Sequence, residues 1–187
     1  MNVYDFDNTI YNGDSTIDFY LFCLKKNPSL LRYLPRQVVF FVLFSFKHIS
    51  KTRFKEEFYV FLSGVRDVDS YINEFWDFHK SKIKPWYMER LSESDVIISA
   101  SPDFLLSEIG KRLKIKIIAS NVNKYNGRYN GENCYGKEKV YRFWEECGDL
   151  SQIDNFYTDS KSDYPMACIA KTAFLVKGNS IKKWIIQ

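Results

Sequence analysis

Apolar and polar positions change their spacing at about residue 87 of the 187-residue chain. Residues 3–7 form a short apolar and acidic run typical of a strand, and Asn12-Gly13 indicates a turn. Between residues 14 and 87, apolar side chains recur at helical spacing. The helices expected there begin at Asp14 or Ser15, at residue 30, at Ser50 or Thr52, and at Asp67 or Asp69. Asn27-Pro28 is expected to end the first helix. The second helix is expected to span 30–46, with a kink or a break at Pro35, and Pro85 is expected to end the helical region.

Short β-branched runs alternate with helical segments beyond residue 94. The expected strands cover residues 95–99, 115–120, 153–158 and 174–176, and the expected helices cover 104–113, 137–147 and 164–170. Residues 125–134 are expected to form a hairpin or loop, and the C-terminus to be irregular. This order predicts an α/β fold with parallel strands and right-handed crossovers. We expect a Rossmann-like parallel sheet core, residues 1–12 and 85–187, with an inserted all-helical cap domain, residues 13–84.

Composition narrows the class of protein without identifying it. Hydrophobic residues make up 45% and charged residues 27%, as in ordinary globular domains. The net charge of +4 is too small to indicate nucleic acid, and we expect none as a partner, but it suits an anionic substrate or membrane surface. The four cysteines, with no C-x-x-C spacing, and the lack of a signal peptide predict a reduced, cytoplasmic setting. Oligomeric state is left open.

The first candidate for chemistry is the run Asp5-Phe6-Asp7-Asn8-Thr9. On a strand, residues two apart face the same side, so Asp5 and Asp7 are expected to project together. Two adjacent carboxylates repel each other unless a cation lies between them, and Mg²⁺ prefers oxygen ligands of this kind. The alternative is an acidic strand end that only caps a turn.

Three later segments carry polar side chains where predicted strands end or helices begin. They are Ile97-Ile98-Ser99-Ala100-Ser101-Pro102, the lysines at 137 and 139, and Thr158-Asp159-Ser160-Lys161-Ser162-Asp163. Each has a plain structural alternative: a helix N-cap at Ser101, a solvated lysine, and an aspartate that forms a turn. Because ligands bind at the carboxyl ends of strands in open α/β sheets, we expect all four sets to converge there.

These runs resemble the motifs of the haloacid dehalogenase-like phosphohydrolases over nearly the whole chain. The resemblance rests on D-F-D-N-T, I-I-S-A-S, a lysine at 139 and T-D-S-K-S-D. The helical insertion after the first motif resembles the cap of the phosphoserine-phosphatase-like branch. The patterns C-Y-G-K-E-K-V and D-S-x-x-D-x-P are most similar to bacterial members of that branch that include phosphatidylglycerophosphatase C.

The resemblance implies a Mg²⁺-dependent phosphatase with an aspartyl-phosphate intermediate. In this role Asp5 attacks phosphorus, Asp7 protonates the leaving oxygen, and Lys139 offsets negative charge. The implied phosphate-binding residues are Thr9, Ser99, Ala100 and Lys139, and the implied metal-binding residues are Asp5, Asp7 (through its backbone carbonyl), Asp159 and Asp163. Lys137 is the rival for the lysine role; we prefer Lys139 because Val140 and Phe143 then continue the expected helix face.

The cap is expected to decide the substrate. Phosphoserine phosphatases carry a glutamate after the first motif, whereas Gly13-Asp14-Ser15 stands here, which disfavours phosphoserine. We expect a phosphorylated small molecule or a lipid head group. Basic residues flank the apolar run 38–46, which is too short to cross a bilayer but suits a membrane interface; its side chains could instead pack within the cap. A catalytically idle phospholigand-binding protein is the alternative function.

Overall fold

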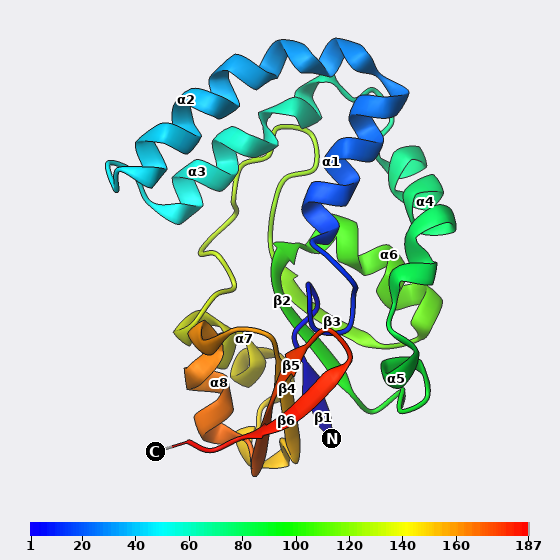
Figure 1. The fold of residues 1–187 in the computed structure, drawn as a ribbon, viewed down its shortest axis with the longest axis vertical. Helices are drawn as coiled ribbons and strands as arrows, with labels where there is room; N and C mark the ends of the chain where they lie inside the picture. The colour runs from blue at the N-terminus through cyan, green and yellow to red at the C-terminus, as the bar shows by residue number, and fades with distance from the viewer. Residues whose placement is uncertain (187) are drawn as a thin grey trace.

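A six-stranded sheet in the order β3-β2-β1-β4-β5-β6 forms the centre of the molecule (Figure 1). The computed structural model describes residues 1–186. Its strands are β1 (Asn2–Tyr4), β2 (Val96–Pro102), β3 (Lys116–Ser120), β4 (Asn155–Thr158), β5 (Thr172–Lys177) and β6 (Ser180–Trp184). The first five pair in parallel, and β6 runs antiparallel to β5. The predicted α/β fold with a mainly parallel sheet is therefore confirmed.

The sheet extends further than the sequence pattern indicates at two places. The C-terminus, expected to be irregular, contains β6, which pairs with β5 across a turn at Gly178. Pairing with β5 supplies the backbone hydrogen bonds that the weakly patterned run 180–184 does not predict by itself. β2 also continues through Pro102, so the next helix begins at Asp103 and its N-cap is Pro102, not Ser101.

Helices cover both faces of the sheet, which explains why its strands are apolar on both sides. The core helices are α5 (Pro85–Met88), α6 (Asp103–Leu113), α7 (Lys137–Cys147) and α8 (Tyr164–Ile169), with short 3₁₀ turns at Leu150–Gln152 and Lys161–Asp163. Val96 and Ile98 pack with the helix residues Phe143 and Met166, whereas Ile97 between them packs in the other hydrophobic cluster, with α6. This period of two places consecutive strand residues on opposite faces.

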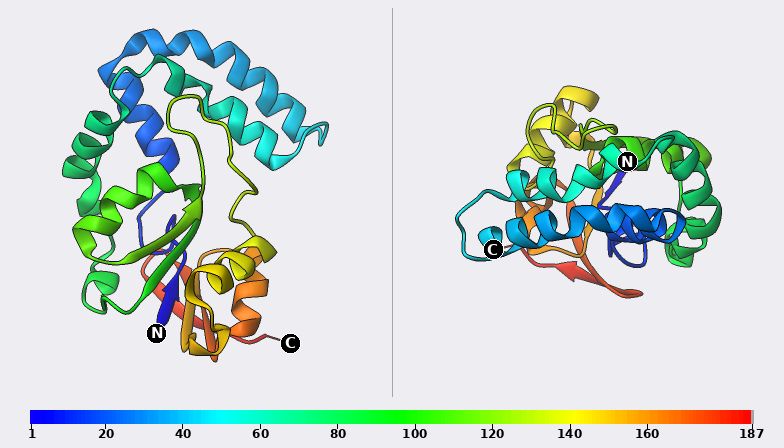
Figure 2. Two further views of the ribbon diagram at one scale, coloured as in Figure 1. Left: turned by 180° about the vertical axis from the view of Figure 1, so that it is seen from behind. Right: turned by 90° about the horizontal axis from the view of Figure 1, so that it is seen from above.

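The inserted segment forms a helical lobe, here called the cap (Figures 1 and 2). Its elements are α1 (Ser15–Lys26), α2 (Leu34–Ser45), α3 (Lys51–Phe58), α4 (Val68–His79) and 3₁₀ segments at Pro28–Tyr33, Tyr59–Gly64 and Lys80–Lys82. In the cap, α1, α2 and α3 lie above the sheet, and α4 runs beside the core helix α6. The side chains of Asp14, Ser50 and Asp67 cap α1, α3 and α4, as predicted. The expected helix over 30–46 is instead a 3₁₀ segment followed by α2, because Pro35 occupies the first turn of a new helix.

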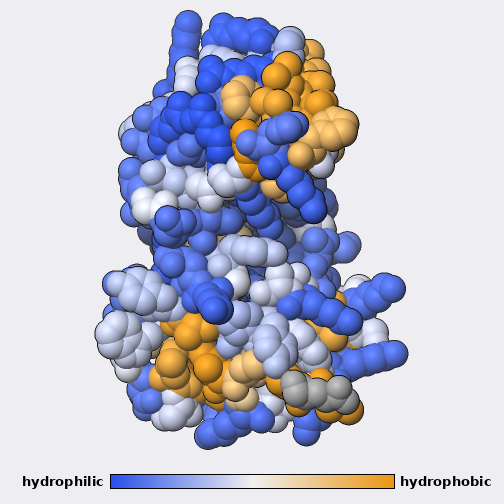
Figure 3. Space-filling model, turned by 90° about the vertical axis from the view of Figure 1, so that its left-hand side faces the viewer, coloured by the Kyte–Doolittle hydropathy of each residue, from blue (hydrophilic) through white to orange (hydrophobic). Residues whose placement is uncertain are grey.

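Helix α2 keeps most of its apolar side chains at the surface. Only Gln37 is buried among its residues, whereas Val38, Val39, Phe41 and Val42 are exposed. Figure 3 shows these apolar side chains gathered on the cap over α2. The alternative in which this run packs within the cap bundle is therefore wrong for most of α2. Within residues 1–186, no helix combines the length and the apolar character needed to cross a membrane.

An arm formed by residues 121–136 connects β3 to α7 and reaches the cap (Figure 1). A single bridge pairs Val122 with Tyr129, which fits the predicted hairpin or loop. The guanidinium of Arg128 lies 3.0 Å from Glu56 of α3, and the amide of Tyr129 donates to the same carboxylate at 3.2 Å. The arm therefore ties the cap to the sheet and holds residues 133–139 beside it.

We expect Gly127→Ala to weaken this contact between the arm and the cap. A Cβ at position 127 would lie 2.4 Å from the Cβ of Tyr59, and φ is +73°. Gly148→Ala is the matched control, since its φ is +77° and no atom lies within 4 Å of the added Cβ. The left-handed conformation alone should cost about 1–2 kcal/mol in the free energy of unfolding. The clash should cost Gly127→Ala about 1–3 kcal/mol more. Urea unfolding of both variants measures the difference, and equal losses would contradict the close contact.

Candidate active site

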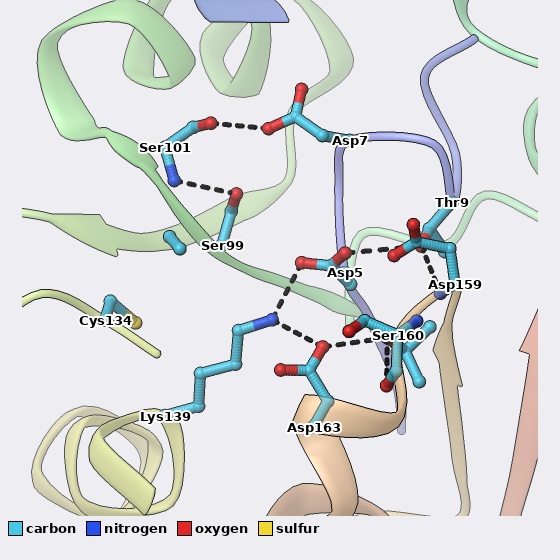
Figure 4. Close-up of polar contacts among 12 residues, drawn as sticks. Asp5, Asp7, Thr9, Ser99, Ser101, Cys134, Lys139, Asp159, Ser160 and Asp163 are labelled. Carbon is cyan, nitrogen blue, oxygen red and sulfur yellow. Dashed lines mark hydrogen bonds and ion pairs between the residues drawn. The ribbon is translucent and has the colours of Figure 1, made fainter. Parts of the chain in front are cut away.

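Residues from five separate segments of the chain line one cavity at the carboxyl ends of β1, β2 and β4. The cavity has a volume of about 230 Å³. Its walls include Asp5, Asp7, Ser99, Ala100, Lys139, Asp159 and Asp163, that is, every predicted site residue except Thr9. β1 lies between β2 and β4 in the sheet, so the ends of these three strands are adjacent. The predicted convergence of the four sets is therefore what the fold produces (Figure 4).

Asp5 and Lys139 form the buried centre of the site. The backbone amide of Asp5 donates to the carbonyl of Tyr157 at 2.8 Å, which fixes the end of β1 against β4. The ammonium of Lys139 lies 2.7 Å from Oδ1 of Asp5 and 2.8 Å from Oδ2 of Asp163. Of the two candidate lysines, Lys139 therefore reaches the carboxylates, whereas Lys137 is exposed. One cation joins two carboxylates contributed by distant parts of the chain.

Burial controls the protonation of this centre. Burial raises the pKa of Asp5 to about 7, an effect that Lys139 opposes and the charge of Asp163 reinforces. Burial alone would lower the pKa of Lys139, but the charges of Asp5 and Asp163 raise it above its ordinary value. Partial removal from water and the charge of Asp163 also raise the pKa of Asp159, although this residue stays exposed. The cavity therefore holds more acidic groups than one lysine can neutralise.

Asp7 is held apart from this centre by its own hydrogen bonds. The amide of Ser15 donates to Oδ1 of Asp7 at 2.6 Å, and the hydroxyl of Ser101 donates to Oδ2. Burial raises the pKa of Asp7 to about 6, as does the charge of Asp14, while the two hydrogen bonds oppose the increase. A carboxyl group with a pKa near neutrality can both release and accept a proton at physiological pH.

Thr9 does not line the cavity, although it was predicted to bind phosphate. Its hydroxyl is fully buried, donates to Oδ2 of Asp5 at 3.3 Å and accepts from the amide of Asp159 at 2.9 Å. Since both contacts are with the protein, the geometry favours a positioning role that ties the loop after β1 to the loop after β4. Direct phosphate binding by Thr9 stays a prediction.

Lys55 is a site residue that the sequence analysis missed. It reaches the cavity from α3, and its ammonium donates to the carbonyl of Ala100 at 2.7 Å and to Asn133 at 3.3 Å. Burial lowers the pKa of Lys55 to about 8, and the neighbouring charge of Lys51 lowers it further. The spacing of Lys51 and Lys55 was an available signal, because residues four apart lie on one helix face. Nothing in the sequence, however, shows which way that face points.

The oxygen-rich donors of this cavity are chemically suited to Mg²⁺. Asp5, which is buried, and Asp159, which is exposed, both line it, and carboxylates that share a cavity repel each other unless a proton or a cation lies between them. The other three acidic side chains that line it are engaged by protein donors: Asp163 by Lys139 and Thr158, Asp7 by Ser15 and Ser101, and Asp14 by the amide of Ile17. Accordingly, the described residues contain no group of three or more histidine, cysteine, aspartate or glutamate side chains arranged around a metal position. The side chains of Asp5 and Asp159 are the pair that fits.

Several solved structures share this fold. A protein of unknown function from Bordetella pertussis Tohama I is 17% identical, with a TM-score of 0.75. The matched region covers 92% of this chain and 87% of that one. A phosphoserine phosphohydrolase-like protein from Francisella tularensis subsp. tularensis SCHU S4 is 18% identical, with a TM-score of 0.56 and coverages of 92% of this chain and 86% of that one. A probable phosphoserine phosphatase from Vibrio cholerae is 11% identical, with a TM-score of 0.64. The matched region covers 92% of this chain but only 55% of that one.

The sequence comparisons identify the family. None of the curated proteins matches the chain. A family model described as haloacid dehalogenase-like hydrolase matches residues 3–167, which include all the residues that line the cavity. The match confirms the resemblance drawn from the motifs, and this chain therefore belongs to the haloacid dehalogenase-like hydrolases.

Proposed function

We propose that this protein is a Mg²⁺-dependent phosphatase that hydrolyses a phosphate monoester through an aspartyl-phosphate at Asp5. The observation that carries the proposal is the buried contact of Lys139 with Asp5 and Asp163, with Asp7 in the same cavity. Phosphoryl transfer depends on position and charge neutralisation more than on any other chemistry. This cavity supplies a carboxylate nucleophile, a cation beside it and a separate acid.

In the first step, a carboxylate oxygen of Asp5 forms a bond to phosphorus while the bond between phosphorus and the ester oxygen breaks. Asp7 enters this step protonated and gives its proton to the leaving oxygen, so that an alcohol departs. The pKa of Asp7, raised to about 6 by burial, keeps part of this group protonated near neutral pH. The hydrogen bond from Ser101 fixes which way the carboxyl group points.

In the second step, Asp7 is a carboxylate and takes a proton from water as the water oxygen attacks phosphorus. The bond from phosphorus to Asp5 then breaks, which releases inorganic phosphate and restores both carboxyl groups. Lys139 and the polar groups at Ser99 and Ala100 are in place to stabilise the phosphoryl oxygens. Mg²⁺ held by Asp5, the carbonyl of Asp7 and Asp159 would neutralise phosphate charge as a Lewis acid.

Hydrolysis of an aryl phosphate tests the proposal against an idle phospholigand-binding protein. We expect turnover of para-nitrophenyl phosphate that requires added Mg²⁺ and stops with EDTA. With ³²P-labelled substrate, we expect alkali-labile label on the protein, absent from Asp5→Asn. Binding of phosphate without turnover, under any divalent cation, would instead favour the idle protein. A dehalogenase is disfavoured because that chemistry needs neither a second aspartate at position 7 nor Mg²⁺.

The substrate we propose is a small phosphometabolite or a phospholipid head group. Asp14 stands near the position of the glutamate that binds the substrate amine in phosphoserine phosphatases. Its carboxylate here accepts from the amide of Ile17 at 3.0 Å and caps α1. Because that carboxylate is shorter and already occupied, it is a poor partner for an amine, which argues against phosphoserine.

We expect Lys55 to set the affinity for the phosphate monoester and its dependence on pH. Replacing it with Met should raise KM about 10- to 100-fold, the value of a hydrogen bond to a charged group. Lys55 faces Lys51, Asp7, Asp14 and Cys134, and its pKa lies at about 8. The charged, binding form is therefore lost as pH rises through 8, and KM should increase there. Lys55→Arg keeps its charge and should shift that increase to higher pH. Unchanged pH profiles in both variants would contradict this role.

We also propose that the outer face of α2 contacts a membrane peripherally. Val39, Val42 and Phe46 are exposed on this face, beside the exposed Lys47 and His48. Apolar side chains next to cations suit the interface of an anionic bilayer. Flotation with vesicles that contain anionic lipid should carry the protein upward, and Phe46→Ser should reduce the bound fraction. Recovery of all the protein in the soluble fraction would count against membrane contact.

A further inference from the structure

A second cavity lies between helices α1, α2 and α3 of the cap. We call it the cap groove; its volume is about 470 Å³, and its apolar lining includes Ile17, Leu34, Val38, Phe41, Phe54 and Phe58. This volume falls in the range of pockets that bind small molecules. Among its lining residues, the charged ones, Asp14 and Lys55, both line the phosphate cavity as well. The cap groove is therefore an apolar site with one polar end.

The polar end of the cap groove opens onto the proposed active site. Asp14, Lys55 and Ser101 line both cavities, and Ser101 donates to the proposed acid Asp7. Lys55 contacts the carbonyl of Ala100, so it stands where the two cavities meet. A molecule bound in both cavities would place an anionic group among Lys55, Lys139 and the carboxyl ends of the strands, and an apolar group among the cap helices.

The apolar walls of the cap groove are not covered by the rest of the chain. Leu34, Val38 and Phe41 remain 43%, 50% and 56% exposed, and Ile17 remains 44% exposed. Leu34, Val38 and Phe41 recur at helical spacing, and the stripe faces α3 across the groove. An uncovered apolar surface that begins at a catalytic site is typical of a binding site for an apolar part of a ligand.

We propose that the cap groove binds the aliphatic chain of a phosphate monoester whose phosphate occupies the cavity at Asp5. This inference rests on the proposed phosphatase function and narrows its substrate to an amphiphile with one hydrocarbon chain. A small polar metabolite would occupy the phosphate cavity and leave the groove empty. A hydrocarbon chain would gain free energy from both cavities, since each buried methylene group favours binding.

The length of the groove sets the length of chain that it can cover. From Leu34 to Phe41, α2 rises about 10 Å, at about 1.5 Å per residue. An extended chain advances about 1.2 Å per bond, by comparison with the polypeptide backbone, so about eight carbons span that stretch. Carbons beyond that number would leave the groove and add little to binding.

A series of n-alkyl phosphates tests this inference without any membrane. Ethyl to dodecyl phosphate are assayed with Mg²⁺, each below the concentration at which it forms micelles, and para-nitrophenyl phosphate serves as the reference for activity. We expect kcat/KM to rise about two- to fourfold per added methylene, the gain from its burial, up to about eight carbons and then to level off. A flat series beside normal aryl phosphate turnover would overturn the inference and leave the proposed function intact. Loss of all turnover would instead sink the proposed function.

Two adjacent residues of α2 provide matched variants. Val38 lines the groove and is 50% exposed, whereas Val39 is 55% exposed and lies about 100° around the helix, outside the groove. Val38→Asp should lower the ratio of kcat/KM for octyl over ethyl phosphate at least about tenfold, and Val39→Asp should leave that ratio unchanged. Val38→Thr is nearly isosteric and should lower the same ratio by a smaller factor. If circular dichroism shows that Val38→Asp is unfolded, Val38→Thr provides the test instead. Equal losses in the position 38 and 39 variants would assign the effect to the whole exposed face of α2 and not to the groove, and would overturn the inference.

Discussion

Asp5→Asn should lower kcat for an aryl phosphate by at least about 10⁴-fold, the scale seen when a catalytic nucleophile is removed. The carboxamide has nearly the same shape but cannot form an acyl phosphate, so chemistry and not folding should be lost. The contact of Lys139 with Asp163, which is 2.8 Å in the wild type, does not involve position 5, so we expect the second carboxylate to stay paired in the variant. Steady-state kinetics with Mg²⁺ measures the loss, and circular dichroism checks that the fold is unchanged.

Asp14→Asn is the matched control for that experiment. Asp14 lines the same cavity, and asparagine retains the N-cap of α1 almost as well as aspartate. Asp14 neither attacks phosphorus nor transfers a proton in the proposed reaction and acts only through its charge on the pKa of Asp7, so its loss should change kcat by less than about tenfold, well short of the effect of losing a nucleophile. If the two variants lost activity equally, or if Asp5→Asn kept most of its turnover, the nucleophile would have to be another residue.

Lys139→Met should damage both catalysis and stability. Removal of one cation that faces a developing negative charge should lower kcat by about 10²–10³-fold. The change also leaves the carboxylates of Asp5 and Asp163 buried without their shared partner, which should cost about 3–5 kcal/mol in the free energy of unfolding near neutral pH. Denaturant unfolding in EDTA, which keeps metal ions out of the comparison, measures this loss.

The destabilisation by Lys139→Met should depend on pH in a defined direction. Burial already raises the pKa of Asp5 to about 7 while Lys139 is present, and loss of the lysine raises it further. The folded variant then binds more protons than the unfolded chain above about pH 4, so its stability falls as pH rises toward and beyond 7. We expect the variant to be closer to wild type at pH 5 than at pH 8. A loss that grows toward acid would contradict the unpaired carboxylates.

Lys137→Met is the internal control for both measurements. Lys137 lies two residues away on the same helix and is exposed, whereas Lys139 is 2% exposed. Removal of an exposed lysine should change stability by no more than about 0.5 kcal/mol. The pair of variants therefore separates the two lysines that sequence alone left as rivals. If Lys137→Met lost more activity than Lys139→Met, the assignment of the active-site lysine would be reversed.

The strands, the helices and the acidic motifs follow from local sequence. Apolar runs bounded by turn residues predict β1 to β5, and the capping residues Asp14, Ser50 and Asp67 predict where three cap helices begin. The C-terminal strand β6 was missed because its hydrogen bonds come from β5 and its own side chains carry little pattern. Helix α2 was placed correctly in outline, but the sequence left open whether its apolar run is exposed or packed within the cap, because a hydrophobic run does not specify what covers it.

Apart from Lys55, the sequence by itself determined which residues could take part in the proposed phosphoryl transfer, since carboxylates at strand ends and a lysine at a helix start can be recognised from residue type and order. Only the tertiary structure decided which of them meet. Strand order places β1 between β2 and β4, which brings Asp5 within 2.7 Å of Lys139 and leaves Thr9 behind it. The packing of the cap against the sheet also turns Lys55 and the cap groove toward the same site. Contacts between segments that are distant in the sequence determine which side chains meet, and the spacing of residues along the chain does not predict those contacts.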